Sequence, residues 1–68
     1  RPDHILARQL VEKAAAQGNA VAQYYLGYRY AKGLGIRQNY SLSKEWFGKA
    51  CDNGNQDGCD GYRILKAY

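Results

Sequence analysis

Two cysteines, Cys51 and Cys59, have the most evident chemistry in this chain, because paired thiols can form a disulfide, a redox centre or part of a metal site. They lie on either side of Gly54-Asn55. If one helix ends near Gly54 and the next begins at Asn55, the Cα atoms can approach within the roughly 4.4–6.8 Å that a disulfide spans. This placement favours a disulfide, and the alternative is two separate buried thiols.

Neither a redox centre nor a metal site is predicted. The cysteine spacing is not C-x-x-C, which is the redox pattern. A zinc site needs about four ligands, and His4 is the only histidine. We therefore expect no metal and no cofactor.

The segment Ser41-Leu42-Ser43-Lys44 matches S-x-x-K, the nucleophile motif of penicillin-binding enzymes. The chain contains neither S-D-N nor K-T-G, and it is too short to build an oxyanion hole around Ser41. We expect Ser41 to open a helix, Lys44 to face water, and no residue to be catalytic. A penicillin-binding or β-lactamase-like enzyme is the rival hypothesis, and acylation of Ser41 by a labelled penicillin would distinguish it.

The charge and hydropathy of the chain bear on the class of partner. Ten Lys and Arg residues against six Asp and Glu give a net charge of +4, and the basic residues are spread from Arg1 to Lys66. Nucleic-acid binders concentrate such residues on one face. No apolar run approaches the roughly 20 residues of a membrane span. We predict one small domain, 1–68, that binds another protein and neither binds nucleic acid nor inserts into a membrane.

Four predicted helices position these motifs, because apolar residues recur at helical spacing. Three cover residues 4–17, 20–32 and 40–53, and the fourth follows Asn55. Each is preceded by a residue that favours the N-cap: Asp3, Asn19, Asn39 and Asn55. The predicted inner faces are Leu6, Ala7, Leu10, Val11 and Ala14; then Ala22, Leu26, Gly27 and Tyr30; then Leu42, Ser43, Trp46, Phe47 and Ala50; and finally Tyr62, Leu65 and Tyr68. Trp46 and Phe47 are expected to anchor the core.

The chain repeats itself. Gly18-Asn19 falls on Gly54-Asn55, and Lys13-Ala14 falls on Lys49-Ala50, each 36 residues later. A period of this length is typical of paired-helix solenoids. We predict that residues 1–18 are the second helix of one repeat, that 19–54 form a complete repeat, and that 55–68 form the first helix of a following repeat or a terminal cap.

These residues resemble the Sel1-like repeat family, a relative of the tetratricopeptide solenoids. The matching positions are Ala22, Leu26-Gly27, Tyr30, Gly33, Gly35-Ile36, Trp46-Phe47, Lys49-Ala50 and Gly54-Asn55, while Asn39 and Ser43 depart from the pattern. The resemblance implies an all-α fold, in which four antiparallel helices form a short right-handed α/α superhelix of about two repeats. It also implies protein–protein interaction.

The cysteine pair resembles a pair at the same spacing in cysteine-rich secreted members of this family, such as those of Helicobacter. There it looks like a disulfide between the helices of adjacent repeats. Disulfides persist in oxidising compartments. The resemblance therefore implies an exported bacterial protein, periplasmic or secreted.

A second face of the helix over 20–32 is the candidate binding site. Val21, Tyr25, Tyr28 and Lys32 recur at i, i+4, i+7 and i+11, and Arg29 adjoins them. In the family, the first helix of each repeat lines the concave side, and Tyr and Arg are favoured at interfaces. We predict that these five residues contact the partner. The alternative is that the tyrosines pack on neighbouring repeats.

The leading functional prediction is a non-catalytic binding module, in one version an immunity or inhibitor protein. Besides the enzyme, the alternative is a fragment of a longer repeat scaffold. The Leu6, Leu10 and Val11 face needs more cover than one following hairpin gives. Self-association through the end helices is therefore a further expectation.

Overall fold

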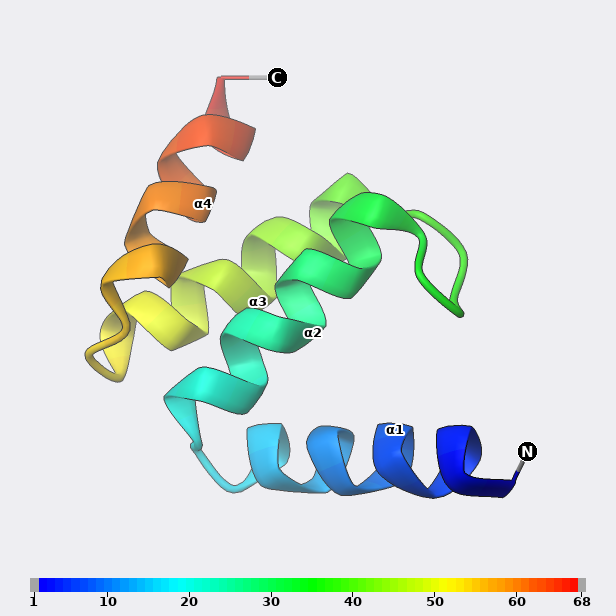
Figure 1. Cartoon of the computed structure of the whole chain (residues 1–68). Coiled ribbons are helices and arrows are strands. Elements are labelled where there is room, and N and C mark those ends of the chain that lie inside the picture. Colours follow the sequence, from blue (N-terminus) through cyan, green and yellow to red (C-terminus); the bar gives the residue numbers. More distant parts are fainter. Residues whose placement is uncertain (1, 68) are drawn as a thin grey trace.

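The computed structural model describes residues 2–67, with side chains from residue 5 onward, and these residues form four α-helices (Figure 1). The helices are α1 (Pro2–Ala16), α2 (Ala20–Lys32), α3 (Tyr40–Asp52) and α4 (Gln56–Lys66). The described residues contain no strand. The predicted all-α fold, an α/α solenoid, is confirmed. The expected role of Tyr68 lies outside the described residues.

Asparagine side chains start three of the helices, as predicted. The Oδ1 atoms of Asn19, Asn39 and Asn55 accept hydrogen bonds at 2.9, 3.0 and 2.9 Å from the backbone N–H groups of Ala22, Leu42 and Gly58. Each bond satisfies a donor that has no partner within the helix itself.

The start of α1 differs from the prediction. The helix begins at Pro2, so Asp3 lies inside the first turn and does not precede it. Proline suits the first helical position, because its fixed φ is already helical and its missing N–H would have no partner there.

Two equivalent turns join α1 to α2 and α3 to α4. Gly18 and Gly54 adopt φ values of 96° and 95° in these turns. A side chain at either position would be strained in this left-handed conformation. The repeat of 36 residues seen in the sequence is therefore also a repeat of backbone geometry.

The core lies on both sides of α3. Phe47 is 5% exposed, and its ring lies over Gly27 of α2 and Gly61 of α4. A Cβ atom added at Gly27 would lie 2.5 Å from this ring, and one at Gly61 would lie 2.7 Å away. The two glycines therefore allow α2 and α4 to pack closely against the same aromatic side chain.

Other predicted core positions of α2 and α3 are also buried. Leu26 is 3% exposed and clusters with Ala15 and Ala22, with Trp46 half-buried against this cluster. Ser43 is fully buried, and its hydroxyl donates a hydrogen bond of 2.5 Å to the carbonyl of Gly27. Phe47 rather than Trp46 is thus the central aromatic residue.

The predicted inner face of α1 is only partly correct. Val11 and Ala14 face α2, as does Ala15, which was not predicted. Ala7 is exposed, and Leu6 and Leu10 are 55% and 57% exposed. Among the described residues, α1 packs against α2 alone (Figure 1). The leucines are exposed because no second helix covers their side of α1.

Gln23 is a buried polar residue that joins three helices. It is 4% exposed, its Nε2 donates to the carbonyl of Ala15 at 3.0 Å, and its Oε1 accepts from Nδ2 of Asn53 at 2.9 Å. A buried polar group left without its partner costs about 1–3 kcal/mol. Gln23→Ala, which leaves the Ala15 carbonyl and Asn53 without this partner, should therefore lower the free energy of unfolding by about 1–3 kcal/mol, as measured by urea denaturation.

The exposed Gln9 of α1 supplies the control. Gln9→Ala should change the free energy of unfolding by less than about 0.5 kcal/mol. If both variants have the same stability, the bridge through Gln23 does not contribute to the fold.

Candidate functional site

The outward face of α2 gathers the five residues predicted to contact a partner, and we call it the aromatic–basic face. Val21, Tyr25 and Tyr28 are 68%, 49% and 39% exposed. Lys32 is also exposed, and Arg29 is half-buried. The structure therefore brings all five to the surface, while Leu26 and Gly27 of the same helix point into the core.

Each exposed tyrosine of this face carries a cation over its ring. The Arg29 guanidinium carbon is 6.0 Å from the centre of the Tyr25 ring, and Lys32 Nζ is 5.9 Å from the centre of the Tyr28 ring. Both pairs have the i, i+4 spacing that brings side chains together on a helix. Such contacts hold the four side chains in a defined arrangement at the surface.

A stack of aromatic rings links this face to the core. The Tyr28 ring lies 6.5 Å from the Tyr24 ring, which in turn lies 5.5 Å from the ring of Phe47. Rings at these separations attract one another. The Tyr28 ring is therefore held in place by Tyr24, which packs on Phe47 in the core.

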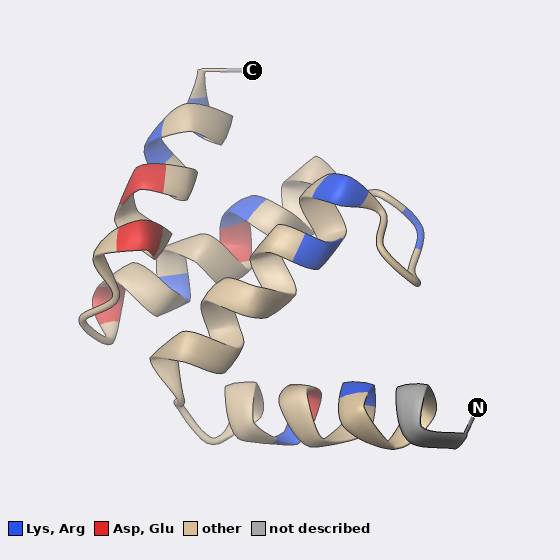
Figure 2. Cartoon of the chain, viewed as in Figure 1, with Lys and Arg blue, Asp and Glu red and all other residues tan. Residues whose placement is uncertain are grey.

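The aromatic–basic face is positively charged. Arg29 and Lys32 are the only charged residues of α2, and both lie in its last turn (Figure 2). Among residues 5–67, the one ion pair joins Arg63 and Asp60 of α4. The cations of the face are thus free to interact with an acidic partner.

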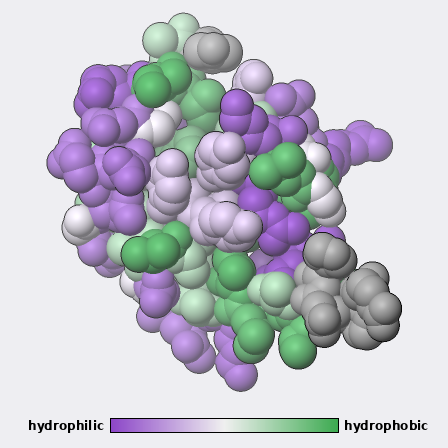
Figure 3. Space-filling view, viewed as in Figure 1, coloured by the Kyte–Doolittle hydropathy of each residue, from purple (hydrophilic) through white to green (hydrophobic). Residues whose placement is uncertain are grey.

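A cleft of about 470 Å³ opens beside this face, between α1, α2 and the loop that follows α2. We call it the α1/α2 cleft, and it is lined by Ile5, Ala7, Arg8, Val11, Tyr25, Arg29, Leu34 and Gly35. A second hollow on the other side of Tyr25 is lined in part by Leu10, Ala14 and Val21. Figure 3 shows apolar residues gathered where α1 lies.

Arg8 and Leu34 line the cleft but were not predicted from the sequence. Arg8 belongs to α1, and its Nη1 donates a hydrogen bond of 3.3 Å to the carbonyl of Gly35, a residue 27 positions later. No local pattern in the sequence reports a contact over this separation. The only signal for this site in the sequence was that Arg8 faces away from Leu6 and Leu10, the exposed leucines of α1.

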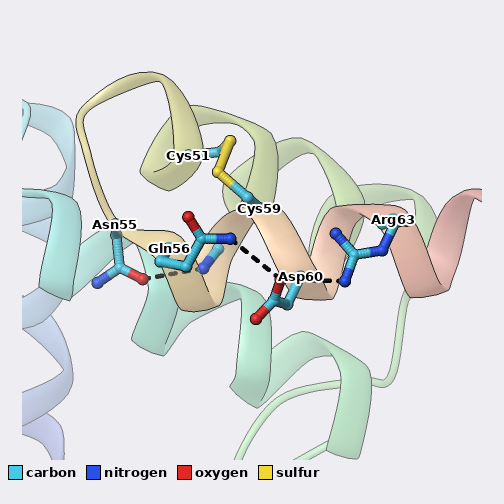
Figure 4. The surroundings of a disulfide bond; sticks show 7 residues. Cys51, Asn55, Gln56, Cys59, Asp60 and Arg63 are labelled. Carbon is cyan, nitrogen blue, oxygen red and sulfur yellow. Dashed lines mark hydrogen bonds and ion pairs between the residues drawn. A yellow bond between two sulfur atoms is a disulfide. The ribbon is translucent and has the colours of Figure 1, made fainter.

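Cys51 and Cys59 form a disulfide between α3 and α4 (Figure 4). Their Cα atoms are 4.5 Å apart, and both residues are half-buried. Asn55, which caps α4, lies in the turn between these two helices, as Figure 4 shows. Neither sulfur is available as a nucleophile or metal ligand while this bond is present. Among the described residues, no three or more His, Cys, Asp or Glu side chains lie close enough together to hold a metal ion.

Ser41 and Lys44, the fixed residues of the S-x-x-K match, both lie in α3. Ser41 is exposed in the first turn of α3, as predicted, whereas Lys44 is half-buried and does not face water freely. Within the described part of the chain, no hydrogen bond joins their side chains. None of its helices is long and apolar enough to cross a bilayer.

Comparisons with known proteins agree with this architecture. The model of the Sel1 repeat matches residues 1–19 and 20–55. Over 61 residues the chain is 38% identical to the ERAD-associated E3 ubiquitin-protein ligase component HRD3B of Arabidopsis thaliana, covering 88% of this chain and 9% of that protein. Over 48 residues it is 35% identical to the putative sel1-like repeat-containing protein L18 of Acanthamoeba polyphaga mimivirus, covering 71% and 8%.

The chain spans less than a tenth of the length of these two relatives. No solved structure shows significant similarity to it. The repeat model nevertheless covers most of the chain, with its helices, turns and core in the arrangement described above. The chain therefore belongs to the Sel1 repeat family.

Proposed function

We propose that this chain is a non-catalytic protein-binding module whose partner contacts the aromatic–basic face of α2. Sel1 repeats mediate binding to other proteins. The observation that supports this particular face is the exposure of Tyr25 and Tyr28, each with a cation over its ring. Tyr and Arg at the centre of an interface contribute most to affinity. Tyrosine buries a large area with little loss of rotamer freedom, and the arginine guanidinium offers several hydrogen-bond donors in one plane.

This module could belong to an exported protein or to a longer repeat scaffold, and a different observation supports each of these two settings. The disulfide supports an exported protein, periplasmic or secreted, because such bonds persist in oxidising compartments. An immunity or inhibitor protein of bacterial origin is one version of that setting. The alternative is a segment of a longer repeat scaffold, and the small share of its relatives that the chain covers supports this alternative. One of those relatives is by name a component of a ubiquitin ligase.

The test is capture of the partner under non-reducing conditions, followed by affinity measurements on purified variants. Truncation of a central aromatic residue typically costs about 2 kcal/mol or more, which is some thirtyfold in affinity. Tyr28→Ala and Arg29→Ala should each lower the affinity for the partner about thirtyfold, while the far-ultraviolet circular dichroism spectrum stays helical. The reason is that both side chains lie outside the core.

Tyr62 of α4 was predicted to face inward but is 38% exposed. It provides a matched control, because Tyr28 is 39% exposed. Tyr62→Ala should leave affinity nearly unchanged. Equal weakening by Tyr62→Ala and Tyr28→Ala would show that α2 is not the contact. A Tyr28→Ala variant that loses its fold but keeps full affinity per folded molecule would also show that α2 is not the contact.

A further inference from the structure

The α1/α2 cleft has apolar walls. Ile5 and Val11 of α1, Tyr25 of α2 and Leu34 of the following loop form them. Ile5 and Leu34 are 56% and 48% exposed, so the walls are open to solvent in the free chain. An aliphatic or aromatic side chain that entered the cleft would remove these surfaces from water, which is favourable in proportion to the apolar area covered.

Two guanidinium groups stand at the rim of this cleft. Arg8 reaches it from α1, where Nη1 donates to the carbonyl of Gly35 at 3.3 Å. Arg29 reaches it from α2, where Nε donates to the carbonyl of Leu34 at 3.2 Å. The two acceptors are consecutive carbonyls of one loop. Helices distant in the sequence therefore bring two cations to neighbouring backbone atoms.

These cations have donors to spare and, among residues 5–67, no acidic side chain within ion-pair distance. A guanidinium carries five N–H donors, and each of these hydrogen bonds uses one of them. Among residues 5–67, no acidic residue lines the cleft. The only ion pair within residues 5–67 is the one in α4. Two like charges held together repel each other, and an anion placed between them would relieve that repulsion.

From this combination we infer that the α1/α2 cleft binds an extended segment of the partner that presents a carboxylate next to an aliphatic or aromatic side chain. This inference rests on the proposed protein-binding function. The apolar side chain occupies the cleft beside Val11 and Leu34. The carboxylate accepts hydrogen bonds from Arg8 and Arg29, since guanidinium and carboxylate match in geometry and can pair through two parallel bonds.

A peptide fits this cleft better than a nucleic acid. Phosphates would satisfy the two guanidiniums, but a nucleic acid has no aliphatic side chain for the apolar walls. Binding of nucleic acid also depends on a continuous track of basic residues. Here acidic residues lie among the basic ones, with Glu12 on α1 itself and Glu45 and Asp60 on α3 and α4 (Figure 2).

The inference can be tested on the intact chain with synthetic probes. The first probe is a blocked hexapeptide in which aspartate and leucine alternate. In NMR titrations of the isotope-labelled protein, it should shift the backbone amide signals of Leu34 and Gly35 and the Nε signals of Arg8 and Arg29. A peptide with asparagine in place of aspartate, and one with serine in place of leucine, should each bind at least tenfold more weakly. Added salt should weaken the binding of the first peptide, because salt screens the rim charges, which are accessible to solvent.

Charge-removing variants sharpen the test. Arg8→Gln and Arg29→Gln should each reduce affinity for the acidic peptide about tenfold or more, since each removes one charged partner of the carboxylate. Arg63→Gln is the matched control, because it removes an arginine of α4 that is far from the cleft and already paired with Asp60. It should leave affinity unchanged. If the two cleft variants fail to fold, the shifts in the wild-type spectrum decide the matter alone.

Three results would overturn the inference: no shift at these four residues with millimolar acidic peptide, equal affinity for the asparagine peptide, or shifts there with a short oligouridylate in place of the peptide. These results are separable from failure of the proposed function. If a captured partner depends on Tyr28 while the acidic peptide is inert, the aromatic–basic face stands and the cleft inference falls. If no partner depends on Tyr28 while the peptide binds as described, only the contact assigned to the aromatic–basic face falls.

Discussion

Phe47→Ala should unfold most of the protein at room temperature. The Phe47 ring is nearly fully buried and packs against Gly27, Gly61 and Tyr24. Removing a buried phenylalanine side chain costs about 3–5 kcal/mol, as lost burial and as the cavity left behind. A domain of this size rarely has more than about 3–5 kcal/mol of stability from its core. Urea denaturation followed by circular dichroism should therefore show little or no folded baseline.

Ile64→Ala is the comparison, because Ile64 is a large apolar residue of the neighbouring α4 that is 58% exposed. Its loss should change stability by less than about 0.5 kcal/mol. A Phe47→Ala variant as stable as Ile64→Ala would mean that the helices are not held together through this ring.

Loss of the disulfide should have the second-largest effect. Cys51→Ser combined with Cys59→Ser should lower the free energy of unfolding by roughly 2–3 kcal/mol, which is the chain-entropy value for a loop of this length. The bond also fixes the start of α4 against the end of α3, and α4 contributes Gly58 and Gly61 to the packing around α3. The double variant should therefore show reduced protection from hydrogen exchange in α4 first.

The state of the thiols can be measured directly. Under non-reducing conditions, the mass of the native protein should be two hydrogens below that of the reduced protein, and alkylation should find no free thiol. Two alkylatable thiols in freshly purified native protein would contradict the bond. They would also remove the support that it gives to an exported location.

The sequence was sufficient to predict most of the helices and the central core. Asn19, Asn39 and Asn55 mark helix starts because an N-cap depends on local chemistry that a short segment contains. Leu26 and Phe47 were predicted from helical periodicity and are buried. The same periodicity predicted the outward direction of the aromatic–basic face, because residues that are not on the core side must point elsewhere.

The features that the sequence did not predict depend on distant neighbours. Periodicity places Leu6 and Leu10 on one apolar face of α1, but it cannot report whether a second helix covers that face. Gln23 is buried because α1 and α3 supply its two hydrogen-bond partners, and nothing near it in the sequence identifies either one. The α1/α2 cleft likewise needs Arg8 and the loop after α2, which meet only in the folded chain.

Contact of a protein partner with the aromatic–basic face of α2 can be measured directly by cross-linking. The most direct test places the photoreactive residue p-benzoylphenylalanine at position 28 or, as a control, at position 62, and irradiates each variant with the partner obtained by capture. Tyr28 and Tyr62 are equally exposed but lie on α2 and α4, so only location distinguishes them. A covalent adduct is expected from position 28 and little or none from position 62. An adduct from position 62 alone, or equal yields from both positions, would contradict contact at the aromatic–basic face.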